Sequence, residues 1–383
     1  MTTEEIGKLA NFKTCFSKKT QFVHLNNAGL APVSSVSVAT AQIWLERFHE
    51  EGMHCNDAYM AAAETARAEL AELAGAKPGQ VAFFQSTAGA ISQVAFGRSL
   101  NPGDEVLTWD QEYASNLYPW REACLRSNAK LVLAKSENNL STPLDNLLAH
   151  VTERTRVIAV SWVQFQTGSV TDLQKLVQFA KPRNIWTVVD VIQGFGILPF
   201  HFENLGLDAI CGGSHKWLVS PVGVGFLILR DELIPVLKPL TIGSSTYGNC
   251  DDPADLHCLP KRDALRFESG SKQVLEITAL GASAKLVRET GVDVIRSEAS
   301  RIANQLRQGL ESLGFTLHSP RDAAPSFINF SHRRISNLKI VTDQLSKFRI
   351  SHALRGPGVR LSTHAFNESS DVEITLKALS SLS

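Results

Sequence analysis

The sequence predicts an α/β fold, with a large domain built on a mainly parallel seven-stranded sheet flanked by helices and a smaller C-terminal α+β domain. From residue 60 to about 230, short apolar runs alternate with amphipathic stretches, a pattern typical of βαβ units. After about residue 265 the order changes to helices, short strands and a last helix. The length of 383 residues also exceeds the ~100–200 residues of one ordinary domain.

Each element of the large domain is predicted from the spacing of its apolar residues. Apolar runs predict strands at 80–84, 105–108, 130–134, 156–162, 185–191, 209–212 and 224–229. Apolar residues three and four positions apart predict helices at 61–73, 90–100, 116–127, 143–151 and 173–181. The last two strands flank SHKWLVSPVG, so they can form an antiparallel pair that closes the sheet.

A polar stretch rich in Gly, Ser and Pro, 241–260, separates the two domains. A long excursion from a compact domain usually serves a site or an interface. Helical and strand patterns then follow at 274–288, 292–313, 315–318, 326–331 and 359–362, with a final helix after Glu368. The predicted division is an N-terminal arm (1–20), a large domain (21–260) and a small C-terminal domain (261–383).

The charge balance argues against partners that need clustered basic residues. The chain has 38 basic and 38 acidic side chains and no basic block, so we expect neither nucleic acid nor an anionic membrane surface as a partner. No apolar run approaches the ~20 residues of a membrane span, and MTTEEIGKLANFK lacks the order of a signal peptide. We expect a cytoplasmic protein. Because the six cysteines form no CxxC pair, we expect no metal site.

The most informative stretch runs from residue 186 to 230. It places Asp190 at the carboxyl end of a strongly apolar strand and Lys216 just after another strand. In open α/β sheets ligands bind outside the carboxyl ends of the strands, so both side chains would face that crevice. One interpretation is a buried ion pair. The other is a pyridoxal phosphate site, in which a lysine forms a Schiff base and an acid pairs with the pyridine nitrogen.

The second interpretation requires a phosphate cradle, and the sequence contains a candidate. QSTAGA (85–90) follows an apolar strand and opens a helical pattern. Its small residues would let backbone N–H groups and the Thr87 hydroxyl meet an anion at the positive end of the helix. The same composition also caps helices that bind nothing. The combination with Asp190 and Lys216 is what favours a cofactor site.

Seven segments, in order, resemble the class V aminotransferase group of fold-type I pyridoxal-phosphate enzymes, which includes cysteine desulfurases, kynureninases and isopenicillin N epimerase-like proteins. These segments are HLNNAGLAP (24–32), FFQSTAGAISQVAFG (83–97), EYASNLYPW (112–120), VVDVIQG (188–194), GGSHKWL (212–218), RFESGS (266–271) and GVRLSTHAFN (358–367). The resemblance covers most of the chain and implies pyridoxal 5'-phosphate as the cofactor.

The resemblance also implies roles for individual residues around the cofactor. Lys216 would form the Schiff base and move protons at the substrate carbon, with Asp190 and His215 as its catalytic partners. Asp190 would pair with the pyridine nitrogen, Gln193 would reach the ring oxygen and Tyr113 would stack on the ring. The phosphate would be held by Thr87, Ala88, His215, Ser214 and, from a second copy of the chain, Ser271. This implies a homodimer with the site at the subunit interface.

The substrate implied by the resemblance is a small amino acid. Arg360 would bind its α-carboxylate, because the planar fork of a guanidinium matches a carboxylate. Arg355 and Asn27 would be further substrate-binding residues. Structural interpretations stay open beside these roles: both arginines could be surface charges, and His215 could be a packed core histidine.

Two departures from the family pattern affect the cofactor contacts. The family's serine two positions before the histidine falls at Gly213, so Ser214 would have to substitute for it. Where many relatives have a ring-facing Asn, this chain has Phe165. Either Gln164 or Gln166 could take over that contact, but strand parity lets only one of them face the same way as Trp162.

A third departure bears on the reaction. Cysteine desulfurases carry a nucleophilic cysteine between two C-terminal arginines, whereas the interval from Arg355 to Arg360 contains none. We therefore do not expect a persulfide-forming desulfurase. A lyase, an epimerase and a transaminase stay open, and HKWLVSPVGVGFL (215–227) resembles the epimerase-like and C–S-lyase-like branch, which favours a C–S lyase or epimerase. A nicotinamide-dependent oxidoreductase would need a GxGxxG turn that is missing here. A non-catalytic relative is disfavoured by the intact Lys216, Asp190 and Arg360.

Overall fold

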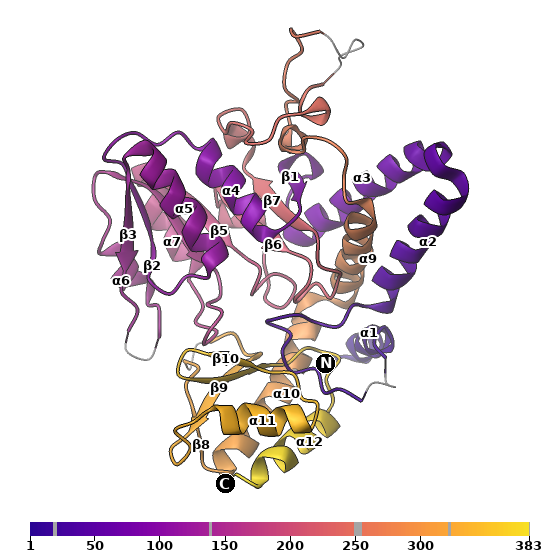
Figure 1. Cartoon of the computed structure of the whole chain (residues 1–383), viewed down its shortest axis with the longest axis vertical. Helices are drawn as coiled ribbons and strands as arrows, with labels where there is room; N and C mark the ends of the chain where they lie inside the picture. The colour runs from indigo at the N-terminus through magenta and orange to yellow at the C-terminus, as the bar shows by residue number, and fades with distance from the viewer. Residues whose placement is uncertain (18–20, 138–139, 249–254, 321–322, 383) are drawn as a thin grey trace.

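The computed structural model of the chain describes residues 1–17, 21–137, 140–248, 255–320 and 323–382. Figure 1 shows a large α/β part above a smaller part that contains the C-terminus. The large part holds a mainly parallel seven-stranded sheet and the smaller one a four-stranded antiparallel sheet, which confirms the predicted fold class. The limits 1–20, 21–260 and 261–383 stay a prediction.

The seven-stranded sheet has the order β1-β7-β6-β5-β4-β2-β3. Its strands are β1 (Val81–Phe84), β2 (Glu105–Trp109), β3 (Lys130–Ala134), β4 (Thr155–Ser161), β5 (Trp186–Asp190), β6 (Ala209–Gly213) and β7 (Gly225–Leu229). As predicted, β6 and β7 pair antiparallel. Strand β1 then adds antiparallel to β7, so β1 ends at the same edge as the parallel strands β4, β5 and β6.

The second sheet has the order β10-β11-β9-β8. Its strands are β8 (Phe315–Leu317), β9 (Phe327–His332), β10 (Ala353–Arg355) and β11 (Gly358–Ser362). The helices of the chain are α1 (Thr3–Thr14), α2 (Ser35–Glu51), α3 (Asn56–Ala74), α4 (Thr87–Gly97), α5 (Ala114–Ser127), α6 (Leu144–Leu148), α7 (Leu173–Ala180), α8 (Phe202–Leu205), α9 (Val274–Thr290), α10 (Val292–Ser312), α11 (Lys339–Lys347) and α12 (Ser369–Ser380).

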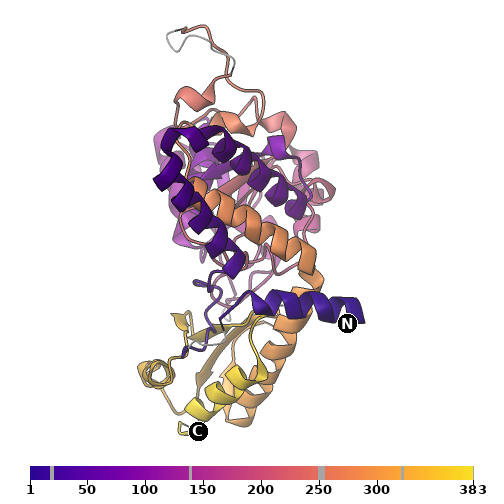
Figure 2. The ribbon, with the colours of Figure 1, turned by 90° about the vertical axis from the view of Figure 1, so that its right-hand side faces the viewer.

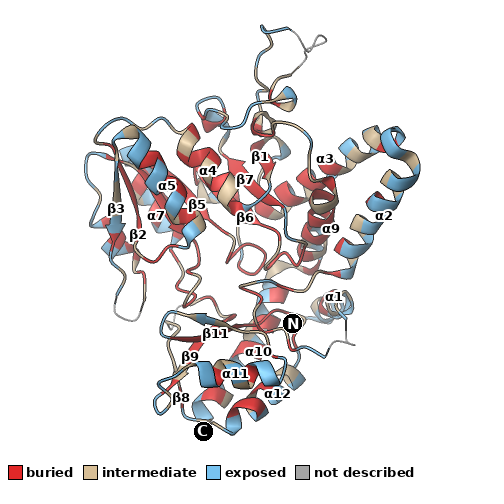
Figure 3. Ribbon diagram, in the orientation of Figure 1, coloured by how far each residue is buried: buried red, intermediate tan, exposed pale blue. Residues whose placement is uncertain are grey.

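The central strands are apolar throughout because both faces of the sheet are covered. In β5 every residue is buried, and successive side chains enter different cores. Val189 belongs to one hydrophobic cluster, while Trp186 and Val188 belong to the other. This alternation follows from the two-residue period of a strand. Figure 3 shows the buried strands and the inward faces of the flanking helices.

Several elements were absent from the prediction because they bury few residues. Helix α2 buries only Ser37 and Trp44, so its sequence carries a weak apolar stripe. It lies beside α9, which also packs on α3 (Figure 2). Helices α1 and α11 and the short strand β10 were also not predicted. Within the described residues, no helix is both long and apolar enough to cross a membrane.

The described residues of the excursion predicted at 241–260, namely 241–248 and 255–260, lie at the top of Figure 1. Leu256, in its described portion, is 94% exposed. Residues 249–254 lie outside the described residues.

Candidate active site

A cavity of about 320 Å³ opens at the carboxyl edge of the large sheet. The strand ends of β5 and β6, the start of α4 and the smaller sheet all contribute to its wall. Its lining residues are Ala28, Gly29, Ser86, Thr87, Ala88, Tyr113, Ser115, Phe165, Asp190, Ile192, Gln193, His215, Lys216, Arg355 and Arg360. Most residues proposed from the sequence therefore meet in one place.

Lys216 follows β6 and points its amine into this cavity. The pKa of Lys216 is lowered to about 8, chiefly by burial; the charge of Asp190 opposes this shift, and the positive charges of Arg360 and Arg355 contribute to it. The amine lies 5.9 Å from the centre of the Tyr113 ring. A lysine with this pKa has an appreciable neutral fraction near pH 7, which a nucleophilic amine requires.

Asp190 ends β5 and is 3% exposed. Burial raises the pKa of its carboxyl group to about 6, although a hydrogen bond from the Ile192 N–H and the charge of Lys216 both oppose that effect. The Ile192 nitrogen donates to Asp190 Oδ1 at 2.9 Å. A buried carboxylate with a raised pKa binds a protonated nitrogen strongly, because water does not compete for it.

The start of α4 forms a cradle for an anion. The Ser86 hydroxyl already accepts the Gly89 N–H at 3.1 Å, but Thr87 Oγ1 is buried and has no partner. Strand β7 passes so close that a Cβ on Gly225 would lie 2.3 Å from the Ser86 carbonyl carbon. An unpaired hydroxyl at a helix N-terminus fits a phosphate group.

Gly213 stands where the resemblance places a phosphate-binding serine, and Ser214 was the proposed substitute for that serine. A Cβ on Gly213 would lie 2.8 Å from Thr87 Oγ1, so the Thr87 side chain occupies the space where that serine would be. Ser214 does not line the cavity. Its hydroxyl donates to the carbonyls of Val224, at 3.1 Å, and Pro221. The phosphate contact proposed for Ser214 is therefore not one that the structure brings together.

His215 lines the cavity as a neutral imidazole. Burial and the neighbouring charge of Lys216 together lower its pKa to about 4. A neutral histidine donates one N–H to an anion but adds no charge.

Tyr113 and Phe165 form one wall. Tyr113 precedes α5, is 46% exposed and contacts Phe165 edge to face, with ring centres 5.1 Å apart. Neither of the two glutamines left open by the sequence lines the cavity. Gln164 donates to Glu112 Oε1 at 2.9 Å and Gln166 donates to Gln111 at 3.3 Å. Of residues 164, 165 and 166, it is therefore Phe165 that lines the cavity.

Arg360 lies on β11 and is 1% exposed. Its Nη2 donates to Asn26 Oδ1 at 2.9 Å, Nη1 donates to the Phe165 carbonyl, and Nε has no partner. Among the described residues it has no carboxylate partner. Burial and the charge of Arg355 lower the pKa of Arg360 to about 9. A buried guanidinium with only neutral partners is prepared for an anionic ligand.

Two other proposed residues lie differently from the simplest expectation. Gln193 lines the cavity, but its amide donates to the Ala28 carbonyl at 3.0 Å and accepts from Trp217 at 3.3 Å. Asn27 is fully buried outside the cavity and donates to the Ser362 carbonyl at 2.8 Å. Asn26, the preceding residue, is the one that contacts Arg360. Asn26 forms an isolated bridge with Ser362 on β11 at the start of the turn over 27–29, and sequence reasoning missed it because no local pattern shows which residue of such a turn faces Arg360.

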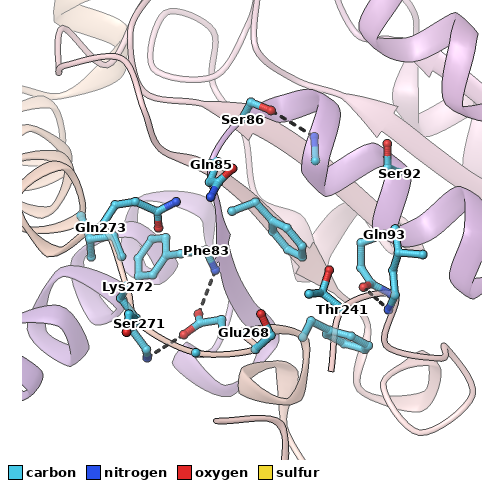
Figure 4. A pocket seen from close by; sticks show the side chains of 17 residues that line it. Phe83, Gln85, Ser86, Ser92, Gln93, Thr241, Glu268, Ser271, Lys272 and Gln273 are labelled. Carbon is cyan, nitrogen blue, oxygen red and sulfur yellow. Dashed lines mark hydrogen bonds and ion pairs between the residues drawn. The ribbon is translucent and has the colours of Figure 1, made fainter. Parts of the chain in front are cut away.

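Ser271 lies in a neighbouring cavity of about 420 Å³, on the other side of the phosphate-cradle turn. Ser86 lines both cavities. Figure 4 shows Ser271 across this second cavity from Ser86, with Glu268 and Lys272 beside it. Within one chain Ser271 therefore does not reach the site of Lys216. No group of three His, Cys, Asp or Glu side chains in the described part of the chain has the arrangement of a metal site.

Comparison with known proteins gives consistent matches. The family model described as aminotransferase class-V matches residues 24–351. A probable cysteine desulfurase of Pyrococcus abyssi is 24% identical over 83% of this chain and 82% of its own length. One of Pseudomonas aeruginosa is 29% identical over 82% of this chain and 81% of its own.

Two solved structures show the same fold. The cysteine desulfurase CsdA of Escherichia coli superposes with a TM-score of 0.86 and 22% identity, covering 97% of both chains. The cystine C-S lyase C-DES, in complex with its reaction product cysteine persulfide, superposes with a TM-score of 0.86 and 20% identity, covering 95% of this chain and 98% of its own.

These names correct one expectation from the sequence. The missing cysteine between Arg355 and Arg360 was taken to exclude a persulfide-forming desulfurase, and the relatives named as cysteine desulfurases contradict that exclusion. The physical error lies in the premise. A persulfide can leave on a small molecule, as the named product of C-DES is a cysteine persulfide, so this interval does not decide the matter.

Proposed function

The chain belongs to the class V aminotransferase family of pyridoxal-phosphate enzymes, and on that basis we propose that it cleaves the carbon–sulfur bond of cysteine or its disulfide, cystine. The observation that carries the proposal is the convergence of Lys216, Asp190 and Arg360 on one cavity at the carboxyl edge of the sheet. The relatives named above as cysteine desulfurases, and the neighbour named as a cystine C-S lyase, support sulfur chemistry.

The cavity residues fit pyridoxal 5'-phosphate. Lys216 would hold it covalently, Asp190 would pair with its ring nitrogen, and the start of α4 with Thr87 Oγ1 would bind its phosphate. When bound, the cofactor supplies an electron sink for negative charge at the substrate's α-carbon. Tyr113 and Phe165 would cover the ring and exclude water from that wall.

The remaining residues act on the substrate. Arg360 binds the α-carboxylate, with Asn26 and the Phe165 carbonyl fixing the direction of its fork. Lys216, once its amine is free and neutral, accepts the α-proton. The sulfur atom then leaves the β-carbon with the electron pair of the broken bond. Neutral His215 would donate an N–H to the cofactor's phosphate. Because it carries no charge, it does not repel Lys216.

We also propose a homodimer, because Ser271 lines the neighbouring cavity and not the cavity that holds Lys216 of the same chain. A second copy could present Ser271 to the phosphate across the cavity that Ser86 shares. The cytoplasmic location stays a prediction.

The test begins with the colour of the purified protein. Incubation with pyridoxal phosphate should give visible absorbance that borohydride removes, leaving a reduced adduct on Lys216. Protein supplied with L-cysteine should then release pyruvate, ammonia and sulfide, and protein supplied with L-cystine should release pyruvate, ammonia and cysteine persulfide. Formation of a keto acid that keeps the sulfur, with pyridoxamine phosphate, would indicate an aminotransferase. Racemised substrate would indicate an epimerase, and a coloured protein that changes no amino acid would indicate a non-catalytic relative.

A further inference from the structure

Glu112 is a buried carboxylate behind the Tyr113–Phe165 wall, and the reaction described above does not use it. It is 6% exposed and does not line the cavity. Its two oxygens accept four hydrogen bonds. Oε1 accepts from the Ser161 N–H at 2.8 Å and from Gln164 Nε2 at 2.9 Å, and Oε2 accepts from Ser161 Oγ at 2.5 Å and Asn116 Nδ2 at 3.1 Å.

Each of these partners belongs to a segment that presents a residue to the cavity. Ser161 ends β4 and pairs in register with Asp190 on β5. Gln164 directly precedes Phe165, whose carbonyl accepts from Arg360. Asn116 lies in the first turn of α5, the helix that begins directly after Tyr113. One carboxylate therefore joins the end of β4, which pairs with the strand of Asp190, to the Tyr113–Phe165 wall and to the segment whose carbonyl accepts from Arg360.

The ionised form of Glu112 is the one that these partners satisfy, because all four are donors. Burial, together with the nearby charge of Asp190, raises its pKa to about 7, against the opposing effect of the bonds from Ser161 and Asn116. A buried carboxylate with no cation beside it is costly unless every oxygen is hydrogen-bonded. A glutamine here would turn an NH₂ group toward at least one donor.

We propose that Glu112 is a positioning residue for substrate binding: it holds the 161–165 segment against α5, so that Phe165 aligns Arg360 for a carboxylate and Tyr113 stands over the cofactor. The inference rests on the proposed function, because it assumes the pyridoxal-phosphate site. Its contribution is to the direction of the Arg360 fork rather than to contact with substrate.

The test compares Glu112→Gln with a matched control, Glu105→Gln. Glu105 is also a buried acid, at the opposite end of the same sheet on β2, where its Oε2 accepts from Thr152 Oγ1 at 2.6 Å. Each protein is loaded with pyridoxal phosphate and titrated with glycine, which has no β-substituent to lose. Visible absorbance reports binding, and a thermal melt of each protein reports stability.

We expect Glu112→Gln to bind glycine about ten-fold more weakly than the wild type, because a misdirected guanidinium loses one charged hydrogen bond. Glu105→Gln should keep wild-type affinity even where its melting temperature falls as far. Equal glycine affinity in the wild type and Glu112→Gln would overturn the inference, as would an equal loss in both variants.

Gln164→Ala provides a second route if Glu112→Gln does not fold. It removes one of the four donors to Glu112 and should weaken glycine binding by about three-fold, a smaller effect because the other three hydrogen bonds remain; unchanged affinity would count against the inference. The two failures are distinguishable. A wild-type protein that takes up no pyridoxal phosphate overturns the proposed function and this inference together, whereas a coloured Glu112→Gln protein with wild-type glycine affinity overturns this inference alone.

Discussion

Arg67 and Arg360 are both fully buried, at 0% and 1% exposure, yet Arg67 has carboxylate partners whereas the partners of Arg360 are neutral. Arg67, on α3, forms two hydrogen bonds to Glu268, at 2.6 and 3.1 Å, and others to Glu64 and the Val81 carbonyl. Lys272 completes this ion-pair cluster at 2.6 Å from Glu268, as Figure 4 shows. Arg360 has the Asn26 amide and the Phe165 carbonyl instead.

The difference shows in the proton affinity of the two groups. Nearby carboxylates raise the pKa of Arg67 despite its burial, whereas burial, with Arg355 adding to it, lowers the pKa of Arg360 to about 9. A structural arginine is folded together with its anion. An arginine buried without one carries a desolvation cost that only a ligand can offset. This contrast separates scaffold from site without reference to any relative.

The largest expected effect is on stability at Arg67. Arg67→Met leaves Glu268 buried with Lys272 alone and breaks the bond to the Val81 carbonyl, so unfolding in urea should show a loss of about 3 kcal/mol. Arg360→Met, measured alongside, should lose less than about 1 kcal/mol, because it removes an uncompensated charge. Equal losses would break the comparison.

The next effect is on substrate affinity at Arg360. Arg360→Met should raise the KM for cysteine or cystine by about 100-fold, the value of a charge-assisted pair of hydrogen bonds, while the bound cofactor keeps its colour. Arg67 does not line the cavity, so a variant there that still folds should keep its KM. Loss of cofactor colour with unchanged KM in Arg360→Met would show that Arg360 serves the cofactor and not the substrate.

The smallest effect is on the pH dependence of cofactor uptake. Only the neutral amine of Lys216 reacts, and its pKa is lowered to about 8, so the uptake rate should rise with pH around a midpoint near 8. Removing the positive charge of Arg360 raises that pKa, and the midpoint should move upward by about half a unit in Arg360→Met. It should stay in place in a folded Arg67→Met protein. Stopped-flow absorbance measures both.

The sequence was sufficient where local pattern and chemistry agree. Apolar runs of β5, buried on both faces, predicted its place in the sheet, and the polar residues directly after such runs predicted that Asp190 and Lys216 meet at one edge. The Ser/Thr/Gly turn before α4 likewise predicted Thr87 at the cavity. It failed for weakly amphipathic elements such as α2, whose few buried residues leave no clear stripe, and for the exclusion drawn from a missing cysteine.

What the sequence by itself determined is the fold class, the family and the residues that can react. Tertiary structure alone decided which side chains meet: Asn26 rather than Asn27 contacts Arg360, Phe165 rather than either glutamine lines the cavity, and Thr87 fills the space beside Gly213. The reason is that reactivity belongs to a residue type, whereas direction depends on packing between segments far apart in the chain. Glu112 illustrates the point, because its four hydrogen bonds join segments that no local pattern relates.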